Sequence, residues 1–193
     1  MKITQAWLKE QLACPDGYKW ACGVLKDKPM EAKKFIKITA DHRMDWANWV
    51  IVRVMDYDQY VSYAVYAAEQ VIDIYEKKYP NDKRPRNAIE AAKKCIGLKG
   101  AAARDAAGAD ARDARDAWAA EVATGAAWAA RAAEVAAWAA WAACAVGAAR
   151  AARAAEVAAW AAGAACAVGA ARAAAEKEMK IKILNYGLTL LKD

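Results

Sequence analysis

The chain has 193 residues, of which 59% are hydrophobic and 27% charged, enough for one domain with a sizeable core. Its net charge of +6 lies mostly in residues 1–100, where 18 Lys and Arg face 13 Asp and Glu. This excess could attract nucleic acid, a nucleotide or an acidic protein, but ordinary solubilising charge explains so modest an excess better. The start lacks a long apolar run, and no stretch offers the ~18 strongly apolar residues of a membrane span. We therefore expect no signal peptide, no membrane segment and a cytoplasmic location.

Residues 1–100 have mixed composition, with apolar residues at helical spacing between turn residues. Turns are predicted at Cys14–Gly17 and at Lys28–Pro29, and a loop at Tyr79–Pro85. The predicted helices run from Ile3 to Leu12, from Tyr18 to Leu25, from Met30 to Ile38, through Trp46, Trp49, Val50 and Arg53, from Asp58 to Tyr79, and from Arg86 to Ile96.

Aspartates mark the expected starts of two of these helices. Asp41 or Asp45 can cap the helix that carries Trp46, and Asp58 can cap the longer helix after it, because a carboxylate accepts from the free N–H groups of a first turn. The end of the chain, from Met179 to Leu190, predicts an amphipathic helix that covers one edge of a bundle.

Residues 101–174 differ sharply, because 42 of these 74 residues are alanine and none is proline. Alanine has the highest helix propensity, so helix is predicted throughout. The segment also contains an internal repeat of 22 residues: the pattern from Arg131 to Trp138 returns from Arg153 to Trp160. Each repeat is either one helix or part of a longer helix, and we favour breaks near Gly125 and Gly147, since an unbroken helix would be exceptionally long.

The predicted fold class is therefore all-α. We expect a single domain over residues 1–193, with a mixed-composition helical half at 1–100 and an Ala/Trp-rich helical repeat half at 101–193. In the second half, small alanine side chains let helices pack closely, and the large Trp rings fill the remaining space.

The repeat supplies the candidate ligand-binding residues. In each copy an arginine, a glutamate and a tryptophan fall on one helical stripe. A pocket between neighbouring helices could use the ring to stack a base and the guanidinium to meet a phosphate. The alternative, which we favour on general grounds, is that the rings belong to the core and the ion pairs to its margin. The candidates are Arg131, Glu134, Trp138, Arg153, Glu156 and Trp160.

Other groups give weaker indications of chemistry. The Asp41–His42 pair could serve acid–base catalysis, but a helix start explains it better because no nucleophile stands at a telling spacing. The mixed-charge block from Arg104 to Asp116 indicates a solvated helix face, and the basic loop from Lys77 to Arg86 belongs to no nucleic-acid-binding motif. We therefore expect no catalytic residues, no metal and no cofactor.

The five cysteines are odd in number and form no CxxC pair. With a single histidine in the chain, they lack the ligand spacing of a zinc site. We interpret them as small buried side chains in a reducing compartment. They are Cys14, Cys22, Cys95, Cys144 and Cys166.

The stretch from Ala13 to Trp20 has the pattern Cys-x-x-Gly-x-x-Trp, and the stretch from Arg43 to Arg53 has the pattern Asp-Trp-x-x-Trp. These motifs resemble the opening and a helix of a family of small helical immunity proteins. The Ala-rich tract from Ala101 onward matches the family in style. Such domains occur beside bacterial polymorphic toxins and in phage genomes, so the resemblance implies an all-α protein that neutralises a toxin or another component of a conflict system. It implies no catalytic residues.

The sequence thus favours a non-enzymatic binding protein that neutralises a toxin or a host-defence component, as an immunity or phage anti-defence inhibitor does. The alternative is a small-molecule sponge that sequesters a nucleotide immune signal through the repeat residues. The expected partner is a protein target or a nucleotide signal, nucleic acid is disfavoured, and self-association into a homo-oligomer is left open.

Overall fold

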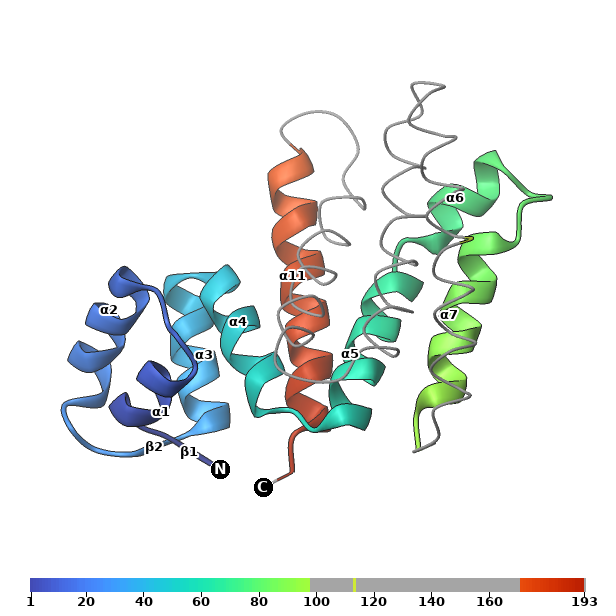
Figure 1. The fold of residues 1–193 in the computed structure, drawn as a ribbon. Helices are drawn as coiled ribbons and strands as arrows, with labels where there is room; N and C mark the ends of the chain where they lie inside the picture. Colours follow the sequence, from blue (N-terminus) through green and yellow to red (C-terminus); the bar gives the residue numbers. More distant parts are fainter. Residues whose placement is uncertain (98–112, 114–170, 193) are drawn as a thin grey trace.

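The computed structural model describes residues 1–97, residue 113 and residues 171–192 of the chain. Its fold is all-α, as predicted, with one pair of very short strands (Figure 1). The elements are β1 (Lys2–Ile3), α1 (Gln5–Glu10), α2 (Pro15–Leu25), β2 (Met30–Glu31), α3 (Ala32–His42), α4 (Met44–Val54), α5 (Tyr57–Glu69), α6 (Ile72–Lys78), α7 (Arg84–Cys95) and α11 (Ala171–Leu190). The 22-residue repeat, with its expected breaks at Gly125 and Gly147, lies outside these residues and stays a prediction.

The N-terminus is fixed by an antiparallel strand pair that the sequence did not predict. Lys2 pairs with Glu31 and Ile3 with Met30, and the Ile3 side chain is fully buried. The helix predicted from Met30 therefore starts two residues later, at Ala32, and it extends beyond Ile38 to His42.

The predicted turn at Cys14–Gly17 is wrong, because these residues begin α2. Cys14 is the N-cap, and its Sγ accepts from the backbone N–H of Gly17 at 3.4 Å. Pro15 follows at the first helical position, where its fixed φ suits a helix and its missing N–H costs nothing. Proline and glycine, which often end a helix, stand here at the start of one.

Helices α3 and α4 pack closely as neighbours, and the residue between them is Arg43. Arg43 is the N-cap of α4 in extended conformation, and it makes no side-chain cap. The two predicted caps are therefore wrong: Asp41 lies in the last turn of α3, and Asp45 lies in the first turn of α4, where its charge favours the positive helix end. Asp41–His42–Arg43 is a helix end rather than a helix start.

The long helix predicted from Asp58 to Tyr79 is two helices, α5 and α6. Asp56, not Asp58, is the N-cap, and it forms a capping box with Gln59 in which each side chain accepts from the other residue's backbone N–H. The helix breaks at Gln70 and Val71, where Val71 leaves helical geometry and stays fully buried.

The predicted loop after α6 is present but shorter, because α7 begins at Arg84 rather than Arg86. Pro85 takes a position in the first turn, as proline prefers. Asp82 organises the loop: it accepts from the Tyr75 hydroxyl at 2.6 Å and from the Arg84 backbone and guanidinium. These bonds fix the angle between α6 and α7.

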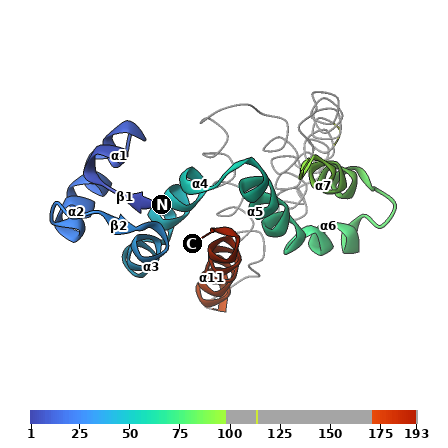
Figure 2. The same cartoon turned by 90° about the horizontal axis from the view of Figure 1, so that it is seen from below.

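The end of the chain returns to the first half of the sequence, because α11 packs on both α4 and α5 (Figures 1 and 2). The predicted apolar face is confirmed at Ile183 and Leu184, which are buried, whereas Ile181 is exposed. Tyr186 stacks on Tyr66 of α5 with ring centroids 3.9 Å apart, and the Leu190 carbonyl accepts from Gln59 at 2.6 Å. Residues that are far apart in the sequence therefore share one core.

Among the described residues, no helix combines the length and the apolar character that crossing a membrane requires.

Candidate functional site

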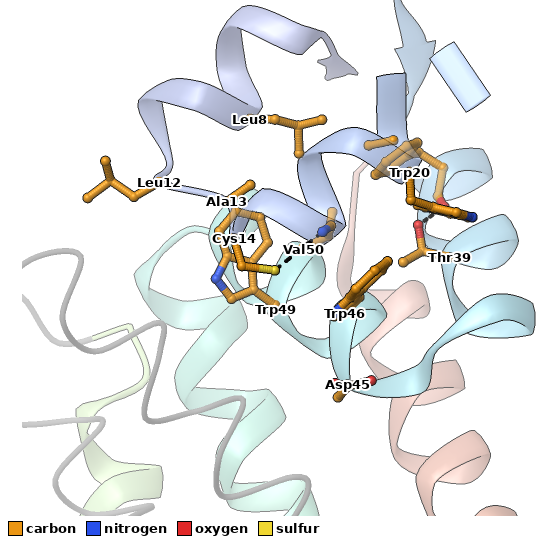
Figure 3. Close-up of a pocket in the computed structure, with 13 residues that line it drawn as sticks. Leu8, Leu12, Ala13, Cys14, Trp20, Thr39, Asp45, Trp46, Trp49 and Val50 are labelled. Atoms are coloured by element: carbon orange, nitrogen blue, oxygen red, sulfur yellow. Dashed lines mark hydrogen bonds between the residues drawn. The ribbon is translucent and has the colours of Figure 1, made fainter. Parts of the chain in front are cut away.

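An apolar pocket of about 250 Å³ lies between the α1–α2 pair and helices α3 and α4 (Figure 3). Both motifs of the family resemblance contribute to its wall. It is lined by Leu8, Leu12, Ala13, Cys14, Gly17, Trp20, Ala21, Phe35, Thr39, Asp45, Trp46, Trp49 and Val50. The tryptophans among them are only half-buried, so their rings meet both core and solvent.

The Cys-x-x-Gly-x-x-Trp spacing has a local physical reason. Cys14 caps α2, and Gly17, one turn further, faces the Trp46 ring of α4. A Cβ at Gly17 would lie 3.1 Å from the Cys14 sulfur and 3.7 Å from the Trp46 ring, so a side chain here would crowd the cap. One turn further, Trp20 reaches the same pocket.

Trp20 is the centre of an aromatic cluster that joins three helices. Its ring stacks on His42 with centroids 4.7 Å apart and planes within 4° of parallel, and it lies 5.8 Å from the Trp46 ring at a tilt. His42 also lies 5.5 Å from Trp46. His42 thus packs on the aromatic cluster beside the pocket and stays exposed to solvent.

Asp45 and Arg43 form an ion pair at the pocket rim. The Arg43 guanidinium donates to both carboxylate oxygens, at 3.2 and 2.7 Å, and lies 4.6 Å from the Trp46 ring centroid. Burial by itself raises the pKa of Asp45, but the hydrogen bonds and charge of Arg43 outweigh it, so the pKa lies below its ordinary value. The same pairing raises the pKa of Arg43.

Trp49 carries a second arginine on its ring. The Arg53 guanidinium lies 4.0 Å from the ring centroid, and its Nη1 donates to the Trp49 carbonyl at 3.0 Å. Trp7 packs edge-on against the same ring, with centroids 6.4 Å apart. Burial lowers the pKa of Arg53, since desolvation disfavours its charged form.

Leu12 stands at the rim with 86% of its surface exposed, and its side chain points away from the other pocket residues (Figure 3). Its φ is 58°, in the left-handed region where glycine usually ends a helix. The N–H of Leu12 bonds the Lys9 carbonyl, and that of Ala13 bonds the Leu8 carbonyl, both at 3.0 Å. A strained backbone that holds an apolar side chain in water marks a candidate contact residue.

The six ligand-binding residues predicted from the repeat (Arg131, Glu134, Trp138, Arg153, Glu156 and Trp160) all lie outside the described residues, so they stay predictions. The mixed-charge block lies there too, apart from Asp113, which is helical and exposed.

The basic loop predicted from Lys77 to Arg86 uses its arginines internally. Arg84 pairs with Asp82 at 2.6 Å, and Arg86 pairs with Glu76 at 2.6 Å. In each case the hydrogen-bonded partner raises the pKa of the arginine. These arginines therefore hold α6 and α7 together, and they are less available to a phosphate.

The cysteines differ from the prediction of uniform burial. Cys95 is buried, Cys22 is half-buried, and Cys14 is exposed because it serves as a helix cap at the pocket. Cys144 and Cys166 lie outside the described residues. Within the described ranges, the acidic, cysteine and histidine side chains form no cluster suited to a metal ion.

Comparisons with protein-family models, with curated proteins and with solved structures found no match for this chain. The pocket is therefore characterised by its own geometry. The sequence showed both tryptophan motifs but did not predict that they meet at one pocket. Their shared tryptophan content was the feature that could have suggested it. Leu12 gave no sequence signal as a contact residue.

Proposed function

We propose that this chain is a non-enzymatic binding protein that docks a protein target through the pocket between α2 and α4. One observation carries the proposal: Trp20 from one motif and Trp46 and Trp49 from the other line a single half-exposed apolar pocket. Tryptophan is the residue type most enriched where truncation weakens protein–protein binding strongly.

The rim supports the same conclusion. Leu12 holds its apolar side chain in solvent at the cost of a left-handed backbone, roughly 1 kcal/mol for a residue other than glycine. A partner that covered Leu12 and entered the pocket would remove apolar surface from water at about 25 cal/mol per Å². The pocket is apolar with few polar groups, as is typical of sites that receive a side chain or small ligand.

The class of target follows from the resemblance alone. Both motifs similar to those of helical immunity proteins contribute to the pocket wall, so the proposed role is to neutralise a toxin or a host-defence component in the cytoplasm of a bacterial host. The alternative, sequestration of a nucleotide signal, depends on Arg131, Trp138 and their repeat counterparts, and it stays a prediction.

The test compares four forms of the full chain as baits in a host lysate, followed by titration of purified target. Trp46→Ala should weaken binding by at least about 30-fold, the effect of losing a contact worth 2 kcal/mol. Tyr79→Ala, which truncates a half-buried aromatic residue remote from the pocket, should leave affinity unchanged.

Leu12→Gly separates binding from folding. Glycine adopts a φ of 58° without strain, so the variant should be as stable as the wild type or more stable, yet bind the target more weakly. A target that binds Trp46→Ala and Leu12→Gly as tightly as the wild type would refute docking at this pocket.

A further inference from the structure

Arg53 extends the pocket wall by one helical turn. It follows Trp49 by four residues on α4, a rise of about 6 Å, and its guanidinium lies on the Trp49 ring at 4.0 Å. Because Trp49 lines the pocket, the charge of Arg53 lies beside the pocket rather than inside it.

Arg43, the N-cap of α4, and Arg53, in its last turn, differ in whether a carboxylate neutralises their charge. Arg43 is neutralised by two hydrogen bonds to Asp45. Arg53 is half-buried; within residues 1–97 and 171–192 it donates to the carbonyl of Trp49 and has no carboxylate within ion-pair distance. A guanidinium has five N–H donors in a planar fork, so Arg53 keeps donors for a bidentate carboxylate.

We propose that the docked segment carries a bulky apolar side chain, which enters the pocket beside Trp46 and Trp49, and an acidic residue whose carboxylate pairs with Arg53. The inference rests on the proposed function, because it names the chemistry of the partner at the same pocket. Because the Arg53 guanidinium lies 4.0 Å from the ring centroid of Trp49, which lines the pocket, the apolar side chain and the acidic residue lie close in the sequence of the segment.

Charge favours this partner over a basic one. Residues 1–100 carry 18 Lys and Arg against 13 Asp and Glu, which attracts acidic segments at long range. A carboxylate that pairs with a partly desolvated, stacked guanidinium makes stronger hydrogen bonds than one that meets a fully hydrated lysine. Arg53 is thus the residue that would set specificity, while the Trp rings supply affinity.

The experiment is a selection of phage-displayed random heptapeptides on the full-length wild type, on Arg53→Gln and on Lys78→Gln. Lys78 lies over the Tyr79 ring at 5.4 Å, so its variant removes a similar cation from an aromatic ring far from the pocket. The wild type and Lys78→Gln should enrich peptides with a large apolar residue near Asp or Glu. Arg53→Gln should enrich the apolar residue without the acid.

Synthetic peptides that differ only by Glu or Gln then measure the effect. The Glu form should bind the wild type on the order of tenfold more tightly, and bind Arg53→Gln no better than the Gln form. Apolar peptides without an acidic preference would overturn this inference and leave the proposed function standing, as would an acidic preference that survives Arg53→Gln. Peptides enriched in Lys and Arg would also overturn it. The same selection is also run on Trp46→Ala and Leu12→Gly, and enrichment that is unchanged on both would overturn both proposals.

Discussion

The contact between α11 and the first half of the chain depends on the absence of a side chain at Gly187. A Cβ there would lie 2.6 Å from Cε2 of Tyr63 and 2.7 Å from Cδ1 of Ile51, closer than real Cβ contacts. The Ile51 methyl can yield, but the Tyr63 ring is fully buried and its hydroxyl donates to Asn48 at 2.6 Å. Gly187→Ala must therefore displace α11 or strain the α4–α5 core.

The magnitude follows from two opposing effects. Overpacking of a close-packed core costs about 1–3 kcal/mol, whereas replacing glycine by alanine inside a helix gains about 1 kcal/mol. Contacts of 2.6 and 2.7 Å place the overpacking cost in the upper part of that range, about 2–3 kcal/mol, so we expect Gly187→Ala to lower the free energy of unfolding by about 1–2 kcal/mol. For a chain of this size, that lowers Tm by roughly 2–8 °C.

Gly23 in α2 provides the matched control, because a Cβ there would meet nothing within 4 Å. Gly23→Ala should raise the free energy of unfolding by about 1 kcal/mol through helix propensity alone. Urea unfolding followed by circular dichroism measures both variants. A Gly187→Ala protein that gains stability as Gly23→Ala does would refute the close approach of α11.

Two further predictions concern buried and partly buried polar groups. Tyr63→Phe removes the hydroxyl that donates to the buried side-chain Oδ1 of Asn48, so the free energy of unfolding in urea should fall by about 1–3 kcal/mol; an unchanged midpoint would contradict the bond. The Arg84 side chain, aided by other hydrogen bonds, lowers the pKa of Asp82 from 3.8 to about 2. This shift corresponds to about 2 kcal/mol of the free energy of unfolding, which solvent screening reduces to about 1 kcal/mol. A lowered pKa stabilises the fold above about pH 4 and loses this effect as pH falls toward 2, so Asp82→Asn should be less stable at pH 7 and nearly equal to the wild type at pH 2. A difference that stays constant from pH 7 to pH 2 would contradict the sign of the shift.

Helical periodicity and composition predicted the all-α class and the position of most helices in residues 1–97. The element boundaries that were predicted wrongly lie at residue types that suit more than one local structure. Proline and glycine at positions 15 and 17 read as a turn, but proline also fits the first turn of a helix, and the cysteine before it acts as the cap. Likewise, Asp56 and Asp58 both suit a cap, and only the reciprocal bond with Gln59 selects Asp56.

The pocket could be predicted only in part. The Trp spacing on α4 is a local pattern and was visible, whereas the meeting of Trp20 with Trp46 depends on how α2 packs against α4. The exposure of Leu12 depends on a left-handed backbone that apolar residues seldom adopt, so no local sequence pattern predicts it. The break at Val71 is also tertiary in origin, since the residue stays fully buried where the helix ends.

The packing of α11 on α4 and α5 has a consequence for synthesis of the chain. The Leu190 carbonyl and the Gln59 amide that bonds it are 131 residues apart in the sequence. At about 5–20 residues per second, a ribosome needs roughly 7 to 26 seconds to make that stretch, so the apolar surface around Ile51 and Tyr63 is made well before α11, the helix that packs on it. Such surface is prone to aggregation in a growing chain, so the folding yield in cells should depend on chaperones and on translation speed more than the stability of the finished protein would suggest.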